Sequence, residues 1–169
     1  NIKELTKEIP LATLKNTYQG KTALVISAGP TLDRNIETIK KYRKNVVIIT
    51  VGTALKTLIK HGIKPDFLCI IETFDSSRQL ENVDLSDVNF ITEPYSHPIL
   101  RRFKYKNTFL HISSNMPVNE FWTEVSGESS DEYISKGTVS YTALNTARIL
   151  GCSKIILVAL LIIFGNPFD

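Results

Sequence analysis

The chain has 169 residues, which is enough for one domain with a sizeable buried core. Its 20 lysines and arginines and 17 acidic residues leave a net charge of +3, and the cations are dispersed, so we expect no nucleic-acid partner. The longest apolar run, residues 155–164, is too short to span a bilayer, so we expect no membrane partner. Two cysteines without a disulfide framework, and an amino terminus without a signal pattern, favour a cytoplasmic location.

The amino-terminal part of the chain differs in character from the rest. Residues 1–20 are a polar lead-in, for which we expect a helix followed by a loop that ends at Gly20. Residues 21–169 form the main domain, in which apolar runs alternate with helical segments. Because the chain opens with Asn1 rather than Met and stops just after an apolar run, we expect it to be an excerpt from a longer protein.

The main domain alternates strand and helix patterns. The apolar runs predict strands at residues 22–27, 45–51, 67–71, 88–92, 108–112 and 154–160. Helical spacing predicts helices at residues 32–42, 53–61 and 139–150, with less regular patterns at 98–103 and 118–124. Because the strands are rich in Val, Ile and Leu and do not alternate with polar residues, they suit a parallel sheet covered on both faces. The order predicts a doubly wound α/β fold with a mostly parallel sheet, whose ligands bind at the carboxyl ends of the strands.

The most informative stretch reads LVISAGPTLDRNIE and starts at Leu24, where a buried strand enters a helix through small residues. Such a turn lets backbone N–H groups and a helix amino terminus approach a phosphate. Pro30 suits a first helical turn, and Thr31 and Asp33 can accept hydrogen bonds from free N–H groups. The spacing matches neither the dinucleotide fingerprint nor a Walker A loop, so an ordinary strand-to-helix turn is the alternative. The residues that we expect to bind a phosphate here are Ser27, Gly29, Pro30, Thr31 and Asp33.

Two carboxylates follow the strand predicted at residues 67–71. Glu72 and Asp75 lie at its carboxyl end, on the expected ligand edge, where they could bind a ribose, hold a divalent metal or act as acid or base. Solvated loop acids are the alternative. Asp66, which opens the same strand, is explained as punctuation between two elements.

A second candidate anion site precedes the helix predicted at residues 139–150. Its sequence SKGTVS contains hydroxyl groups and a glycine, and Gly137 and Thr138 are its expected ligand-binding residues. Ala143 and Ala147 share one face of the helix and permit close packing on the sheet, so the body of the helix needs no functional explanation.

The three histidines are scattered along the sequence. His61 ends a predicted helix, where a cation suits the dipole, and His111 lies within a predicted strand. His97 follows a predicted strand and is a candidate catalytic residue. The spacing of His, Cys and Asp does not resemble a zinc site, so we expect no metal site of that kind.

Three segments, taken in order, resemble the family of flagellar motility accessory factors and MptE-like proteins. They read ISAGPTLDRNIE (26–37), GTALKTLIKHGIKPDF (52–67) and GTVSYTALNTARILGCSKIILV (137–158). The resemblance covers residues 21–158, most of the chain. It implies a Rossmann-like nucleotide-binding domain related to bacterial sialyltransferases that use CMP-activated sugars.

The resemblance implies three alternative functions. The motility members are implicated in moving nonulosonic acids onto Ser or Thr of flagellin, which implies a glycosyltransferase with a CMP-activated sugar as donor substrate and flagellin or another protein as acceptor. An archaeal branch includes a pterin pyrophosphokinase that uses ATP and Mg²⁺, for which Glu72 or Asp75 would hold the metal. The third alternative is a non-catalytic module that binds a nucleotide or a flagellar partner.

Residues are carried over from the family by position. Residues 27–31 fall on the nucleotide-phosphate turn, residues 137–139 on the second ligand loop, and Glu72 where the family usually has Asp at a strand end. The family's last strand ends in a Gly-Gln-Asp-Leu type of motif, whereas this chain has Leu161 at the acidic position, which motivates the non-catalytic alternative. The base that would deprotonate the acceptor is unassigned, with His97 as candidate.

A doubly wound sheet would bring these separate segments to one edge. We therefore expect the turn after residue 26, the strand end at Glu72 and the start of the helix at residue 139 to converge on one cleft. The expected lining of this pocket is Gly29, Thr31, Glu72, Gly137 and Thr138.

Overall fold

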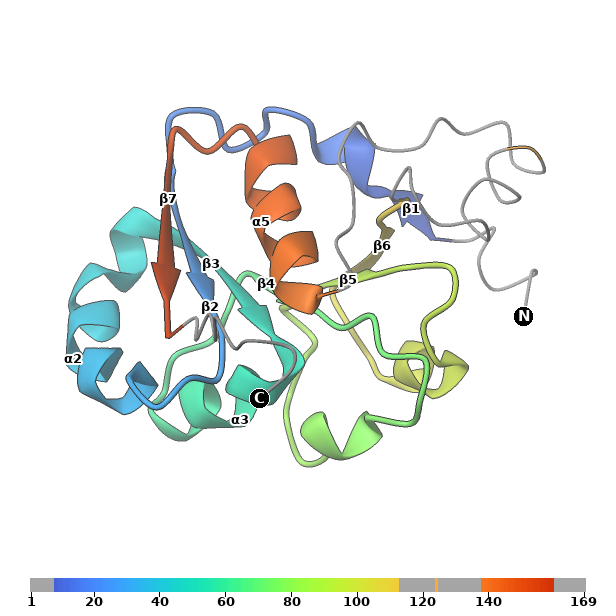
Figure 1. The fold of residues 1–169 in the computed structure, drawn as a ribbon, viewed down its shortest axis with the longest axis horizontal. Coiled ribbons are helices and arrows are strands. Elements are labelled where there is room, and N and C mark those ends of the chain that lie inside the picture. Colours follow the sequence, from blue (N-terminus) through green and yellow to red (C-terminus); the bar gives the residue numbers. More distant parts are fainter. Residues whose placement is uncertain (1–7, 113–123, 125–137, 160–169) are drawn as a thin grey trace, which may run out of the picture.

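The structure is a computed structural model that describes residues 8–112, 124 and 138–159. In this part of the chain, seven parallel strands form one sheet in the order β1-β6-β5-β4-β3-β2-β7 (Figure 1). The strands are β1 (Ile9–Pro10), β2 (Thr22–Ile26), β3 (Val46–Val51), β4 (Phe67–Cys69), β5 (Asn89–Thr92), β6 (Asn107–Leu110) and β7 (Lys154–Val158). The α-helices are α2 (Leu32–Tyr42), α3 (Gly52–Lys60) and α5 (Val139–Ile149), and the 3-10 helices are η1 (Leu11–Leu14), η2 (Arg43–Asn45), η3 (Ser77–Gln79) and η4 (Pro98–Arg102).

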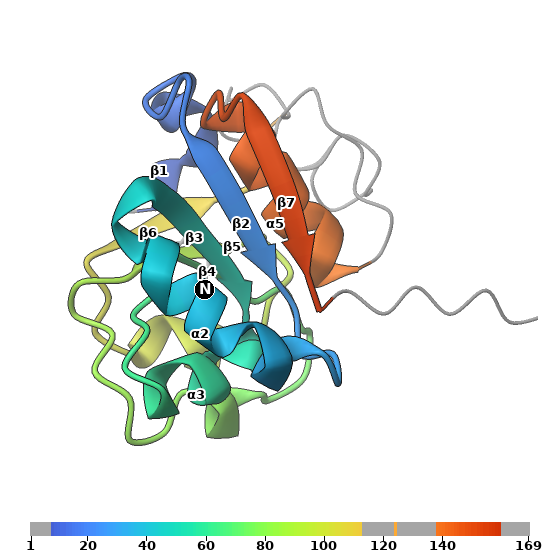
Figure 2. The same cartoon turned by 90° about the vertical axis from the view of Figure 1, so that its left-hand side faces the viewer.

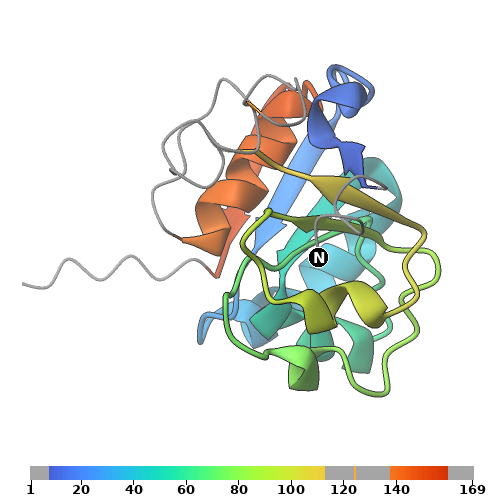
Figure 3. The same ribbon diagram turned by 90° about the vertical axis from the view of Figure 1, so that its right-hand side faces the viewer.

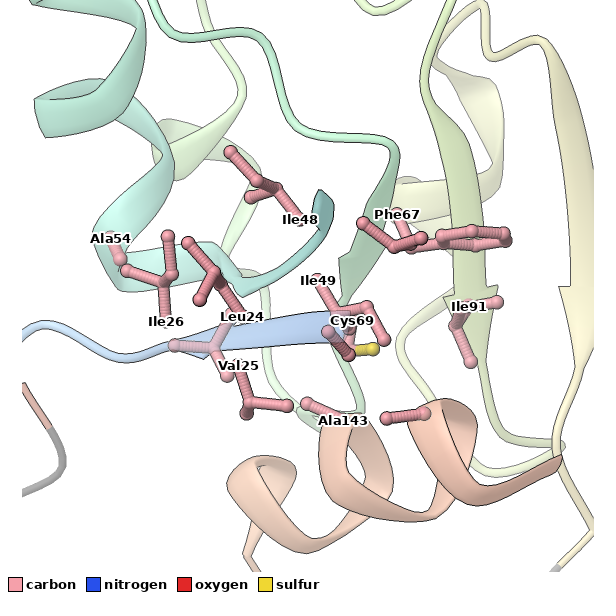
Figure 4. Packing of buried hydrophobic residues seen from close by; sticks show 14 of the residues in the cluster. Leu24, Val25, Ile26, Ile48, Ile49, Ala54, Phe67, Cys69, Ile91 and Ala143 are labelled. Atoms are coloured by element: carbon pink, nitrogen blue, oxygen red, sulfur yellow. The ribbon is translucent and has the colours of Figure 1, made fainter. Parts of the chain in front are cut away.

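Helices cover both faces of the sheet. Helices α2 and α3 lie on one face and α5 lies on the other (Figure 2, Figure 3). Alternate side chains of β2 point to opposite faces of the sheet. Ile26 points toward Ala54 of α3, and Val25 points toward Ala143 of α5 (Figure 4). Because the central strands are buried on both faces, they read as continuous apolar runs. This arrangement confirms the doubly wound α/β fold.

The position of β7 reverses the direction in which successive strands are added to the sheet. From β2 to β6 the chain adds each strand on the same side of the previous one, and it then returns through α5 to place β7 on the other side of β2. This is the strand arrangement of a topological switch point, outside which α/β sheets bind their ligands.

Residues 8–20 are the part of the lead-in that the structure describes, and they contain a short strand in addition to a helical turn and a loop. Residues 9–10 form the edge strand β1, with Ile9 opposite Phe109 of β6, and η1 follows directly. Glu8 holds this segment in place through an ion pair in which Arg101 Nε lies 2.6 Å from Glu8 Oε1, with both side chains less than one-tenth exposed. Because β1 is a strand only through its pairing with β6, which is far away in the sequence, residues 9–10 carry no local pattern that predicts a strand. Of the less regular helix patterns, 98–103 contains η4, and 118–124 lies outside the described residues except for residue 124.

Asp66 has a structural role at the opposite edge of the sheet from the strand carboxyl ends. Its two carboxylate oxygens accept hydrogen bonds from Arg43 at 2.8 and 3.1 Å. The N–H of Ile48 donates to the same carboxylate at 2.7 Å. The side chain therefore ties η2, the start of β3 and the start of β4 together.

We expect Asp66→Asn to lower the free energy of unfolding by about 2 kcal/mol, because charge-assisted and backbone hydrogen bonds to the carboxylate are weakened. Urea denaturation at neutral pH measures the change. Asp87→Asn is the matched control: its carboxylate pairs with Lys64 at 2.8 Å but is 77% exposed, so its loss should cost less than about 0.5 kcal/mol. Equal effects of the two substitutions would contradict this role of Asp66.

Candidate functional site

The two loops that the sequence assigns to anion binding meet at the carboxyl edge of the sheet. Ser27 follows β2 directly, and Ser140 is the second residue of α5, which runs antiparallel to the strands and so begins at this edge (Figure 1). Their hydroxyl oxygens lie 3.2 Å apart although the residues are 113 positions apart in the sequence. Thr138, immediately before α5, is exposed, and Gly137 lies outside the described residues.

The turn between β2 and α2 is held against the end of β7. The N–H of Ser27 donates to the carbonyl of Val158 at 3.0 Å, and the N–H of Leu32 donates to the carbonyl of Gly29 at 3.0 Å. A Cβ atom at residue 29 would overlap the backbone carbonyl of Ala159. The close approach of the two backbones therefore requires glycine at this position.

The turn presents backbone donors to an incoming anion. Among the described residues, the N–H groups of Ala28, Gly29 and Thr31 have no hydrogen-bond acceptor. The amino terminus of α2 follows directly, with its own partial positive charge. Donors of this kind are what a phosphate group needs.

Two details of the turn correct the expectation from sequence. Thr31 makes no capping hydrogen bond with its side chain, because its backbone is already helical (φ −89°, ψ −3°) rather than extended. Pro30 lies in the turn, ahead of the first residue of α2 at Leu32, and not in the first helical turn. Asp33 is exposed in the first turn of α2, where a negative charge suits the helix dipole.

Glu72 and His97 form a second pair at the carboxyl edge. The N–H of His97 donates to the carbonyl of Glu72 at 2.8 Å, and the Glu72 carboxylate accepts from the N–H of Ile71 at 3.0 Å. His97 Nδ1 accepts from the N–H of Ile99 at 3.3 Å and so caps η4. With Nδ1 as acceptor, a neutral ring carries its hydrogen on Nε2, which can donate a hydrogen bond, and the role of His97 as a catalytic base stays a prediction. The Ser77 side chain and the Ser77 N–H, the latter at 2.9 Å, both donate to Asp75, and these hydrogen bonds hold the pKa of the Asp75 carboxyl below its usual value.

Among the described residues, no hydrogen bond joins the Glu72–His97 pair to the Ser27–Ser140 pair. The single pocket that we expected to contain all the candidate residues therefore stays a prediction. In residues 8–112, 124 and 138–159, no group of three or more His, Cys, Asp or Glu side chains is arranged to hold a metal ion.

A buried polar cluster lies behind this edge, and sequence reasoning did not single it out. Glu93 Oε1 is 3.2 Å from His111 Nδ1 and 3.1 Å from Thr142 Oγ1, and all three residues are fully buried. Glu93 follows β5, His111 follows β6, and Thr142 lies in the first turn of α5. The position of Glu93 directly after a strand on the ligand edge is the signal that could have identified it, as it did Glu72.

The electrostatics of the cluster favour an ionised Glu93. Burial alone would raise the pKa of the Glu93 carboxyl, but hydrogen bonds from His111, Tyr95 and Thr142 outweigh it and lower the pKa below its ordinary value. Because an ionised carboxylate only accepts hydrogen bonds, Nδ1 of His111 carries a proton. Nearby, burial raises the pKa of the Cys69 thiol to about 12, so this thiol is protonated at neutral pH and unreactive.

A parallel sheet with a switch point and helices on both faces defines a Rossmann-like α/β domain. The chain belongs to the family described as 6-hydroxymethylpterin diphosphokinase MptE-like, which it matches over residues 1–159. This membership confirms the resemblance noted in the sequence.

Two known proteins are similar to the chain. It is 32% identical over 72 residues to the 6-hydroxymethyl-7,8-dihydropterin pyrophosphokinase of Methanocaldococcus jannaschii, a match that covers 40% of this chain and 30% of that protein. Its fold is similar to that of the MAf glycosyltransferase from Magnetospirillum magneticum AMB-1, with a TM-score of 0.66 and 23% identity, over 98% of this chain and 29% of that one. The chain thus spans less than a third of either protein. Within its described part, no helix is both long and apolar enough for a membrane span.

Proposed function

We propose that the chain is the nucleotide-binding core of a transferase, and that the phosphate of an activated donor binds between the turn at Ser27–Thr31 and the start of α5. The contact between Ser27 and Ser140 carries this proposal, because it brings two loops with anion-binding character to one point of the sheet edge. The amino termini of α2 and α5 both begin at this edge. The switch point beside β2 is where the fold itself favours a ligand.

We further propose that the donor is a CMP-activated nonulosonic acid, and that it is transferred in the cytoplasm to Ser or Thr of flagellin or another protein. The amino-acid sequence of the turn resembles that of the motility branch, which supports this proposal. The fold shared with a glycosyltransferase over 98% of the chain also supports it. Transfer from such a donor depends mainly on stabilising the phosphate that leaves. The backbone donors of the turn and the hydroxyls of Thr31 and Thr138 would supply this.

A second candidate function is diphosphate transfer from ATP to a pterin. It is favoured by the 32% identity to a pyrophosphokinase. That reaction needs Mg²⁺, and Glu72 is the carboxylate at the carboxyl edge that could bind it. The two functions therefore differ in the nucleotide and in the need for a divalent ion.

Calorimetric titration of the chain with CMP, CDP, ATP and GTP, each with Mg²⁺ and with EDTA, tests the proposal. We expect CMP to bind in both conditions and ATP to bind more weakly. ATP binding that requires Mg²⁺, without CMP binding, would favour the pyrophosphokinase. If no nucleotide binds at millimolar concentration, both enzymatic functions are contradicted for this chain and a non-catalytic module remains.

A further inference from the structure

The buried cluster of Glu93, His111 and Thr142 connects three elements beneath the amino terminus of α5. One carboxylate oxygen, Glu93 Oε1, receives the Thr142 hydroxyl at 3.1 Å and faces His111 Nδ1 at 3.2 Å. The backbone of Glu93 is also held, because its N–H donates to Ser96 Oγ at 3.1 Å and its carbonyl accepts from Arg101 at 3.0 Å. These hydrogen bonds fix the backbone from which the Glu93 carboxylate extends.

Packing alone does not explain this cluster. Ala143, Ala147 and Ile149 already pack α5 on the sheet through apolar contacts, which do not need a buried carboxylate. A buried carboxylate is costly unless hydrogen bonds compensate for the loss of water. The compensation here comes chiefly from His111, with smaller contributions from Tyr95 and Thr142, so the hydrogen bond to α5 is one of those that keep Glu93 ionised.

Thr142 lies two residues after Ser140, the residue that contacts the phosphate-binding turn. Because a helix moves as a rigid unit, the hydrogen bond from Thr142 to Glu93 also fixes the rotation of α5 about its axis. It fixes the position of the first turn of α5 along that axis as well. Ser140 and the backbone N–H groups of that turn are placed by the same constraint.

We propose that Glu93 is a positioning residue that acts through Thr142 to hold the amino terminus of α5 at the ligand edge, with His111 orienting the shared carboxylate oxygen. The effect on a ligand rests on the function proposed above, whereas the positioning of the helix does not. Glu93 is fully buried, and its role is to keep the anion-binding groups in register with the turn after β2.

Substitution of Thr142 tests the proposal with two readouts. Thr142→Val keeps the shape of the side chain and removes the donor, whereas Thr142→Ser keeps the donor. We expect the valine variant to exchange the amide hydrogens of the first turns of α5 roughly 10-fold faster and to bind CMP roughly 5-fold more weakly. The serine variant should restore both quantities to within about twofold of the wild type, which a purely space-filling role would not predict.

Thr146→Val is the matched control: Thr146 lies on the same helix, its hydroxyl donates to the Thr142 carbonyl at 2.8 Å and lies 3.9 Å from Cys69 Sγ of β4, and neither contact involves the Glu93 carboxylate. It should lower the melting temperature but leave CMP affinity and first-turn exchange unchanged. The proposal is wrong if Thr142→Val changes neither readout, or if Thr146→Val changes both equally. If the wild type binds no nucleotide, the proposed function fails, and the exchange data alone still decide whether Thr142 positions the helix.

Discussion

Replacing Gly29 with valine is expected to abolish detectable CMP binding and to lower the stability of the chain. A Cβ atom at this position overlaps the backbone carbonyl of Ala159, and a backbone group at the end of a strand cannot rotate away as a side chain can. The turn and the end of β7 would have to separate, which would also strain the hydrogen bond from Ser27 to Val158. Overpacking of this kind costs about 1–3 kcal/mol. Calorimetric titration and urea denaturation measure the two effects.

Ala28→Ser is the control for this substitution. Ala28 precedes Gly29, is exposed and already carries a Cβ atom, so the change leaves the backbone of the turn in place and should alter stability by less than about 0.5 kcal/mol. A folded Gly29→Val variant with wild-type affinity for CMP would remove the turn from the binding site. It would leave the function supported by family membership alone.

The sequence predicted the parts of the fold that have local causes. The helix expected at residues 32–42 has the bounds of α2, because Leu32, Ile36 and Ile39 follow helical spacing and are all buried. The central strands were recognisable because each is an apolar run short enough for a strand. β1 was not, because Ile9 and Pro10 carry no strand pattern and are strand residues only through pairing with β6. Such pairing is decided by the rest of the fold.

The candidate site likewise has a part that could be predicted from the sequence and a part that could not. Glycine and hydroxyl residues identified the two loops that meet through Ser27 and Ser140, because their chemistry is visible within each segment. Glu93, His111 and Thr142 are each unremarkable in their own segments: an acid after a strand, a histidine in an apolar run and a threonine in a helix of small residues. They form a cluster only because the strand order places β5 beside β6 under α5.

Glu93→Ala is expected to be the most destabilising single substitution that we propose, with a loss of about 3 kcal/mol or more in the free energy of unfolding at neutral pH. It leaves a cavity and removes the acceptor of two buried groups, Thr142 and His111. Urea denaturation measures the loss. Glu93→Gln should cost less, because its side-chain oxygen can still accept from Thr142, but the amide cannot carry the charge.

The pH dependence of the free energy of unfolding separates the contribution of the Glu93 charge from the contribution of the shape of its side chain. Folding lowers the pKa of this carboxyl below its ordinary value near 4.5, so its ionised form stabilises the folded state. That stabilisation is complete above the ordinary pKa and is lost as the pH falls below it through the folded pKa. The groups that face Glu93 are His111 directly after β6, Thr142 on α5, Tyr95 in its own loop and, from β4, Cys69, whose thiol stays protonated at these acidic pH values. The stability difference between the wild type and Glu93→Gln should therefore shrink as the pH falls below the ordinary pKa of a glutamate, and a difference that stays constant as the pH falls would contradict a lowered pKa.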